Sequence, residues 1–171
     1  MNSKTCLKAL NDLGCPHNVI EHSIAVSKKA KKIAVNYSEI TGIKLDMEQI
    51  EYGALLHDIG RSKTHSIDHA VVGAQLLRNL KFTDDLVNIT LKHIGAGIPL
   101  SEAENLGLEP RDYMPYTIEE KVVAHADNLT NGTTEVGIDS VIKKWEKMFG
   151  KDHPSLSRLK KLHKELFQGT P

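Results

Sequence analysis

The sequence predicts an all-α protein, and two observations support this prediction. Apolar residues recur at the three- and four-residue spacing of amphipathic helices along almost the whole chain. Alternating or β-branched runs, which are typical of strands, are missing from the sequence. The chain has 171 residues, enough for one domain with a substantial core. We therefore expect a single compact multi-helix domain over residues 1–171.

The first part of the chain contains three expected helices. The first covers residues 2–13 and the second residues 17–40. The second helix should bury one face, made of Ile20, Ile24, Ile33, Ala34, Tyr37 and Ile40. The third starts after Asp46, whose side chain can cap it, and runs to His57, with Gly60 expected to end it.

Two further helices are expected before the middle of the chain. Ser66 can cap a helix that reaches Leu80. Thr83 or Asp84 can cap the next one, which ends at the glycine-containing break 94–97.

A loop and three helices complete the expected fold. Three prolines and a glycine indicate a loop over residues 98–116, with one short helical turn at 101–106; long loops of this kind often cover a site. Thr117 with Glu120 forms a capping-box pattern for a helix that reaches Leu129. The last two helices are expected at 135–149 and 154–167.

Composition excludes several classes of protein. Lys plus Arg and Asp plus Glu each number 22, so no general field attracts nucleic acid or an anionic membrane. The basic run 28–32 would spread around a solvated helix face without aromatic residues, so we expect no specific nucleic-acid binding. Cys6 and Cys15 predict no disulfide framework, and no apolar segment reaches the roughly 20 residues of a membrane helix. We expect a soluble, cytoplasmic protein that does not bind a membrane, and the sequence does not indicate its oligomeric state.

Four residues on three expected helices have the chemistry of metal ligands. They are His22, the pair His57 and Asp58, and Asp127. Brought together, they would offer two nitrogens and two oxygens to a divalent ion, with positions left open for water or substrate. Each residue also has an ordinary alternative, as a half-buried histidine, a helix-end pair or a solvated carboxylate. Spacing alone leaves both interpretations open.

The combined pattern resembles the H…HD…D signature of the HD-domain metal-dependent phosphohydrolase superfamily, in its HDIG form. His22, His57-Asp58 within LLHDIGR and Asp127 within VVAHADN carry the resemblance, which covers about residues 20–130. It implies an all-helical HD domain with the metal site in the helix bundle. It also implies one or two divalent ions and the hydrolysis of a phosphomonoester or phosphodiester, often of a nucleotide. The metal could be Mn, Fe, Co, Ni, Zn or Mg.

The resemblance extends to a second set of residues. His69 and His93 resemble two further histidines that help to hold a second metal, with Asp58 bridging the ions as a catalytic residue. Arg61 follows the HDIG turn, where several relatives have lysine. It is either a second catalytic residue, which binds phosphate oxygens and offsets the charge of the transition state, or an ordinary arginine at a helix end. Lys63 is a weaker substrate-binding candidate.

The remaining histidines are given less specific roles. His65 lies four residues before His69, so the two can share a helix face; it is either a phosphate-binding residue at the edge of the site or a solvated one. His125 should point to another helix face than Asp127 and serve packing. Surface or packing roles are also expected for His17, His153 and His163.

The function expected from these residues is a phosphohydrolase whose partner is a small phosphorylated substrate, most plausibly a nucleotide. No GYP motif follows His93, so the cyclic-dinucleotide hydrolysis of HD-GYP proteins is not implied. Two other classes fit the same donors. One is an HD-type di-iron oxygenase, and the other is a non-catalytic module that senses a nucleotide or a metal.

Overall fold

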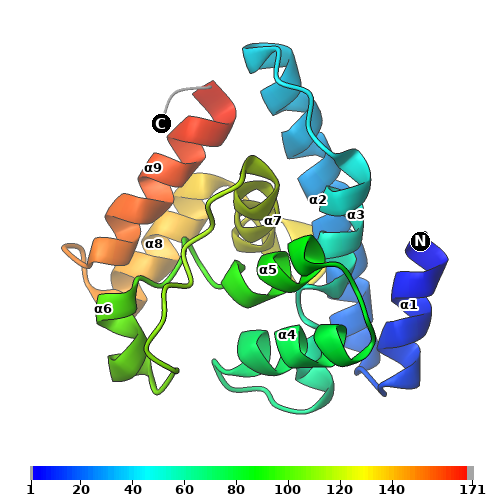
Figure 1. Ribbon diagram of the computed structural model, residues 1–171. Helices are drawn as coiled ribbons and strands as arrows, with labels where there is room; N and C mark the ends of the chain where they lie inside the picture. Colours follow the sequence, from blue (N-terminus) through cyan, green and yellow to red (C-terminus); the bar gives the residue numbers. More distant parts are fainter. Residues whose placement is uncertain (1, 169–171) are drawn as a thin grey trace.

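A computed structural model describes residues 2–168 and confirms the all-α prediction (Figure 1). In chain order the helices are α1 (Ser3–Asp12), α2 (His17–Thr41), α3 (Met47–Leu56), α4 (His69–Asn79), α5 (Asp84–Lys92), α6 (Leu100–Ala103), α7 (Ile118–Asn128), α8 (Ile138–Phe149) and α9 (Pro154–Gln168). Two 3-10 turns, η1 (Ile59–Ser62) and η2 (Glu104–Leu106), and two short antiparallel strands, β1 (Thr130–Asn131) and β2 (Thr134–Glu135), complete the description.

Several helix boundaries follow from capping residues, and the caps at Asp46 and Thr117 are those that the sequence predicts. The Asn2 and Asp46 side chains accept hydrogen bonds at the starts of α1 and α3. Thr117 and Glu120 form both bonds of the capping box at the start of α7. Gly42, with φ of 72°, ends α2 in the left-handed conformation that glycine adopts without strain.

The long helix α2 is the centre of the arrangement. It packs against α3 and α7, and α9 also contacts it (Figure 1). One group of buried apolar side chains lies between α2, α7, α8 and α9 and includes Ile33 and Leu166. A second group joins α1, α3, α4 and α5 and includes Leu10 and Leu77. The HD pair at the end of α3 stands where these parts of the core meet.

Four sequence expectations are corrected by the structure. Gly60 does not end α3, which ends at Leu56; Gly60 instead lies inside η1, against α4. The next helix begins at His69 rather than after Ser66, because Ser66 and Asp68 belong to a separate side-chain-bonded turn. Ile40 is 47% exposed, because the last turn of α2 reaches beyond the helices that cover the rest of it (Figure 1).

The fourth correction concerns the segment before α8. Residues 130–135 form a hairpin around Gly132, so α8 begins at Ile138 and not at residue 135. The expected loop over residues 98–116 is confirmed: it contains α6 and η2 at its short helical turn, and an isolated bridge pairs Ile98 with Tyr113. Among the described residues, no helix combines the length and the apolar character that a bilayer span requires.

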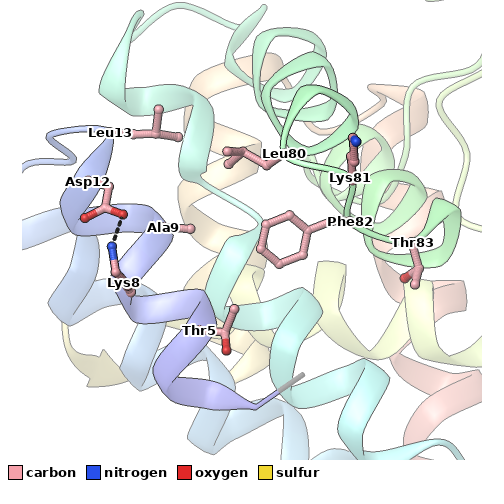
Figure 2. Close-up of a pocket in the computed structure, with 9 residues that line it drawn as sticks. All are labelled: Thr5, Lys8, Ala9, Asp12, Leu13, Leu80, Lys81, Phe82 and Thr83. Carbon is pink, nitrogen blue, oxygen red and sulfur yellow. Dashed lines mark hydrogen bonds and ion pairs between the residues drawn. The ribbon is translucent and has the colours of Figure 1, made fainter.

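A hollow on the surface lies between α1 and the turn that joins α4 to α5 (Figure 2). Leu13, Leu80 and Phe82 give it apolar walls, and Lys8 and Asp12 form an ion pair at its edge. None of its lining residues belongs to the His and Asp groups described below.

Candidate metal centre

Six predicted ligand residues converge from five helices. His22 comes from the first half of α2, His57 and Asp58 from the end of α3, and Asp127 from the end of α7. His69 begins α4 and His93 follows α5. Their ligand atoms form three overlapping groups, each with atoms within 4.8 Å of one another: His22, His57 and Asp58; His57, His93 and Asp127; and Asp58, His69 and His93.

Each of the four histidines is oriented by a backbone carbonyl. The Nδ1 atoms of His57, His69 and His93 donate to the carbonyls of the residues three positions earlier, at 2.7, 2.8 and 2.7 Å. The Nδ1 atom of His22 donates to the Gly132 carbonyl at 2.8 Å. A carbonyl only accepts, so the proton is on Nδ1 in each neutral ring and the Nε2 lone pair is free. All four Nε2 atoms face the two carboxylates, as in metal sites where an outer carbonyl fixes the tautomer.

Asp58 lies at the centre of one half of the cluster. Its Oδ1 atom is 3.0 Å from His69 Nε2 and 3.5 Å from His93 Nε2. The close approach of η1 to α4 makes this possible, since a Cβ on Gly60 would lie 1.9 Å from the His69 carbonyl oxygen. The glycine of the HDIG motif therefore positions Asp58 against α4.

Asp127 lies at the centre of the other half. Its Oδ1 atom is 2.9 Å from His22 Nε2 and 3.6 Å from His57 Nε2. The hairpin β1–β2 supports this half, because its Gly132 carbonyl holds the His22 ring. Asp58 Oδ2, 3.8 Å from His57 Nε2, connects the two halves.

The donor spacings fit divalent ions. Two ligands of one ion lie about 3.0–3.4 Å apart when each bond is about 2.1 Å long, and the distances above run from 2.9 to 3.8 Å. The Nε2 atom of His57 and the Oδ1 atom of Asp58 are buried without a hydrogen-bond partner in the described structure. Buried polar atoms normally have a partner, so these two atoms point to a missing one. The residues present therefore fit a divalent metal.

Electrostatics keep both carboxylates ionised. Burial raises the pKa of Asp58, but His57, His69 and His93 outweigh it and hold this pKa well below its usual range. Burial likewise raises the pKa of Asp127, but His22 and His57 outweigh it and the net direction is down. Burial lowers the pKa of His57, yet the Asp58 and Asp127 carboxylates raise it to about 9. The cluster thus has a strong preference for positive charge.

Of the three substrate-binding candidates, Arg61 contacts the cluster, whereas Lys63 and His65 do not bond to it. Arg61, in η1, donates from Nε to Asp58 Oδ2 at 2.7 Å, so its guanidinium lies at the cluster. Lys63 and His65 are exposed on the turn between η1 and α4, and no hydrogen bond or ion pair within residues 2–168 joins them to the six ligand residues. Because His65 precedes α4, it does not share a helix face with His69, and that expectation is wrong.

His125 and His163 form a pair that the sequence did not predict. His125 is fully buried, as its packing role requires, and its Nε2 atom is 2.9 Å from Nδ1 of His163 on α9. Burial lowers the pKa of His125 to about 3, helped by His163 and Lys29. The pair therefore joins α7 to α9 in the neutral state.

Some functional features could not be found from residue types. The Gly132 carbonyl acts through the backbone, and its only signal in the sequence is a turn-forming Asn-Gly pair at residues 131–132. Asn128 donates from Nδ2 to the Gly95 carbonyl at 2.8 Å and so ties the end of α7 to the segment that follows His93. The only indication of this role in the sequence is that Asn128 directly follows Asp127.

Comparison with known proteins agrees with this geometry. A family model described as HD domain matches residues 19–132, two thirds of the chain. The chain belongs to the HD domain family. An uncharacterized protein of Methanocaldococcus jannaschii is similar to it, with 51% identity over 166 residues and 97% of each chain covered.

Other relatives of this HD domain protein are longer. A tRNA (cytidine(56)-2'-O)-methyltransferase of Picrophilus torridus is 42% identical over 161 residues, which cover 94% of this chain but 45% of the relative. A ribonuclease Y of Thermosipho melanesiensis is 30% identical over 136 residues, covering 77% of this chain and 22% of the relative. The chain thus spans about half the length of the methyltransferase and less of the ribonuclease.

A solved structure shares the fold. The HD domain of the phosphodiesterase PgpH from L. monocytogenes, in complex with cyclic-di-AMP, has a TM-score of 0.57 and 18% identity. The match covers 96% of this chain and 94% of that one. At this identity the likeness establishes the HD fold.

Proposed function

We propose that this protein is a metal-dependent phosphohydrolase that acts on a small phosphate ester, a nucleotide phosphomonoester or phosphodiester. The observation that carries the proposal is the convergence of four Nε2 lone pairs on two ionised carboxylates. Uncompensated lone pairs and charges of this kind are costly inside a protein unless a cation joins them. A hydrolase of the HD family also agrees with the family match.

Two ligand sets are proposed within the cluster. His22, His57, Asp58 and Asp127 would hold one divalent ion, and Asp58, His69 and His93 would hold a second. Paired ions supply a lowered pKa for water and stabilise both the attacking and the leaving oxygen of a phosphate ester. Asp58 would belong to both sets, because Oδ1 faces His69 and Oδ2 faces His57.

Arg61 is the proposed phosphate-binding residue. Its side chain is 29% exposed, so it contacts both the Asp58 carboxylate and solvent. The guanidinium can donate two parallel hydrogen bonds to phosphate oxygens and offset the charge that develops on them. Lys63 and His65, on the adjacent exposed turn, would add positive charge only at the edge.

The names of the relatives support the choice of reaction. Ribonuclease Y and the PgpH phosphodiesterase both act on phosphodiesters by name, and PgpH is seen with a cyclic dinucleotide. The methyltransferase relatives concern tRNA by name. All of these names refer to nucleotides or nucleic acids, and for this reason a nucleotide is the proposed substrate.

A substrate screen tests the proposal. The purified chain would be loaded separately with Mg²⁺, Mn²⁺, Fe²⁺, Co²⁺, Ni²⁺ and Zn²⁺ and given nucleoside 2′-, 3′- and 5′-monophosphates, cyclic dinucleotides and short RNA. We expect phosphate or nucleotide release with at least one metal. Asp58→Ala should lose more than about 100-fold of this activity, whereas Asp152→Ala, which changes an exposed carboxylate, should not.

Three outcomes would contradict the proposal. Oxygen consumption by the Fe²⁺-loaded protein without any phosphate release would favour an oxygenase. Tight nucleotide or metal binding without turnover under all conditions would favour a sensor. Full activity of Asp58→Ala would remove the proposed site. A loss of activity would count in favour of the site only if the circular dichroism of the variant shows that it is folded.

A further inference from the structure

A hollow beside the candidate metal centre is lined mostly by residues that do not belong to the metal cluster. It has a volume of about 230 Å³ and lies between the end of α7, the hairpin and α8. Asp127 lines it and also belongs to the metal cluster, so the hollow opens directly beside the proposed reaction centre.

One wall of the hollow is aromatic and held in place. Trp145, on α8, lines it and is partly buried against the core. A Cβ built on Gly95 would lie 3.2 Å from Cη2 of Trp145, so the indole edge rests on the segment that follows His93. The same segment is tied to Asn128 by a 2.8 Å hydrogen bond. The indole edge therefore contacts a segment that is itself joined to the end of α7, next to Asp127.

The other walls carry polar groups that can bind a ligand. The Asn131 amide and the Ser140 hydroxyl line the hollow, and both residues are exposed. Lys144 also lines it and makes no ion pair with any residue of the described chain 2–168. In contrast, nearby Lys29 and Lys32 are both paired with Glu135. Lys144 is thus an uncompensated cation next to the anionic cluster.

We propose that this hollow is the nucleoside subsite of the enzyme, with Trp145 as the surface on which the base stacks. The inference rests on the proposed function, in which the phosphate of the same molecule lies at the metal cluster. A fixed aromatic ring surrounded by amide, hydroxyl and ammonium groups suits a base, because every base has a π-face and polar edges. The volume of about 230 Å³ lies below the range of about 300–1,000 Å³ for drug-sized ligands, so a single nucleoside unit is the occupant. Its phosphate lies at the metal cluster, and Lys144 adds a positive charge to the lining of the hollow.

Trp145 also provides a direct test, because it is the only tryptophan of the chain. Its fluorescence would be followed in the Mg²⁺-loaded protein during titration with AMP, adenosine, ribose 5-phosphate or inorganic phosphate. We expect AMP and adenosine to change the emission, and ribose 5-phosphate and inorganic phosphate to leave it unchanged at the same concentrations. An equal response to AMP and ribose 5-phosphate, or no response to AMP, would overturn the proposal.

Variants separate stacking from packing. Trp145→Leu keeps an apolar side chain without an aromatic face and should weaken AMP binding roughly 5- to 100-fold by calorimetry. Trp145→Phe should restore most of the affinity. Lys144→Gln should weaken AMP binding more than adenosine binding, and Lys143→Gln, an exposed neighbour outside the hollow, should change neither. Equal affinities of the Leu and Phe variants would contradict a stacking role.

The two proposals can fail separately. If no phosphate ester is hydrolysed but AMP still changes the Trp145 emission, the subsite stands and the hydrolase falls. If nucleotides are hydrolysed while AMP leaves the Trp145 emission of the unaltered protein unchanged, and Trp145→Leu keeps the unaltered KM, the hydrolase stands and the subsite falls.

Discussion

The Nε2 atom of His69 lies 3.1 Å from the Nε2 atom of His93. Each ring already donates its Nδ1 proton to a carbonyl, so in the neutral state two lone pairs face each other. The Oδ1 atom of Asp58, also an acceptor, is 3.0 Å from the first ring and 3.5 Å from the second. Three acceptors at this spacing are stable together only around a positive charge, which is the physical argument for the proposed second metal site.

Removal of His93 should therefore remove one ion and leave the other. We expect His93→Gln to bind one divalent ion fewer per chain than the unaltered protein, because His22, His57 and Asp127 remain in place. Elemental analysis of both proteins after loading with Mn²⁺ measures this. His17→Gln, on the exposed start of α2, is the matched control. An unchanged metal content in His93→Gln would contradict the second site.

Metal removal should destabilise the folded chain. An ion that binds only the folded state adds about 2.7 kcal/mol at a concentration of 100 times its Kd, which corresponds to roughly 5–10 °C in Tm for a domain of this size. Thermal unfolding with Mn²⁺ and with a chelator gives the comparison. A Tm that is the same in both conditions would argue against ion binding at the buried cluster.

Gly60 should resist replacement because η1 and α4 touch there. An alanine Cβ would lie 1.9 Å from the His69 carbonyl oxygen and 2.7 Å from the Gly73 nitrogen, both backbone atoms. We expect Gly60→Ala to cost about 1–3 kcal/mol, or roughly 3–10 °C in Tm, and to lower the metal content. Gly137→Ala, whose Cβ meets nothing within 4 Å, is the matched control. Equal Tm values for the two variants would show that the contact is unimportant.

The buried thiol of Cys6 should lower the free energy of unfolding at alkaline pH. Burial raises the pKa of its thiol from 9.0 to about 11, so the folded chain keeps a proton that the unfolded chain loses. The free energy of unfolding should therefore be unaffected by this group below pH 9 and should fall between pH 9 and 11. Urea unfolding over this range measures the fall, which should be smaller in Cys6→Ala. The same pH dependence in both proteins would contradict the assignment.

Local patterns account for most of what the sequence predicted. Helices such as 118–128 follow from capping residues and periodicity, both of which act within a few residues. The six candidate ligand residues, which the structure brings together, could be named from the sequence because the HD pattern combines positions far apart in the chain. The hairpin at 130–135 was missed because two-residue strands leave no alternating run to detect.

Features that depend on tertiary contacts were not predictable from one sequence. The pairing of His125 with His163 depends on how α9 packs against α7, and neither neighbourhood in the sequence indicates it. The same holds for the hollow at Trp145, whose walls come from α7, the hairpin and α8. Ile40 is an example of a prediction that failed. Its spacing places it on the apolar face of α2, yet it is exposed, because no other element of the described chain covers that end of the helix.

Anomalous diffraction from crystals grown with Mn²⁺ tests the central claim most directly, since it locates ions independently of any activity. The account predicts two anomalous peaks that share Asp58, one bordered by His22, His57 and Asp127 and the other by His69 and His93. The absence of any peak in contact with these six residues, at a saturating metal concentration, would contradict it.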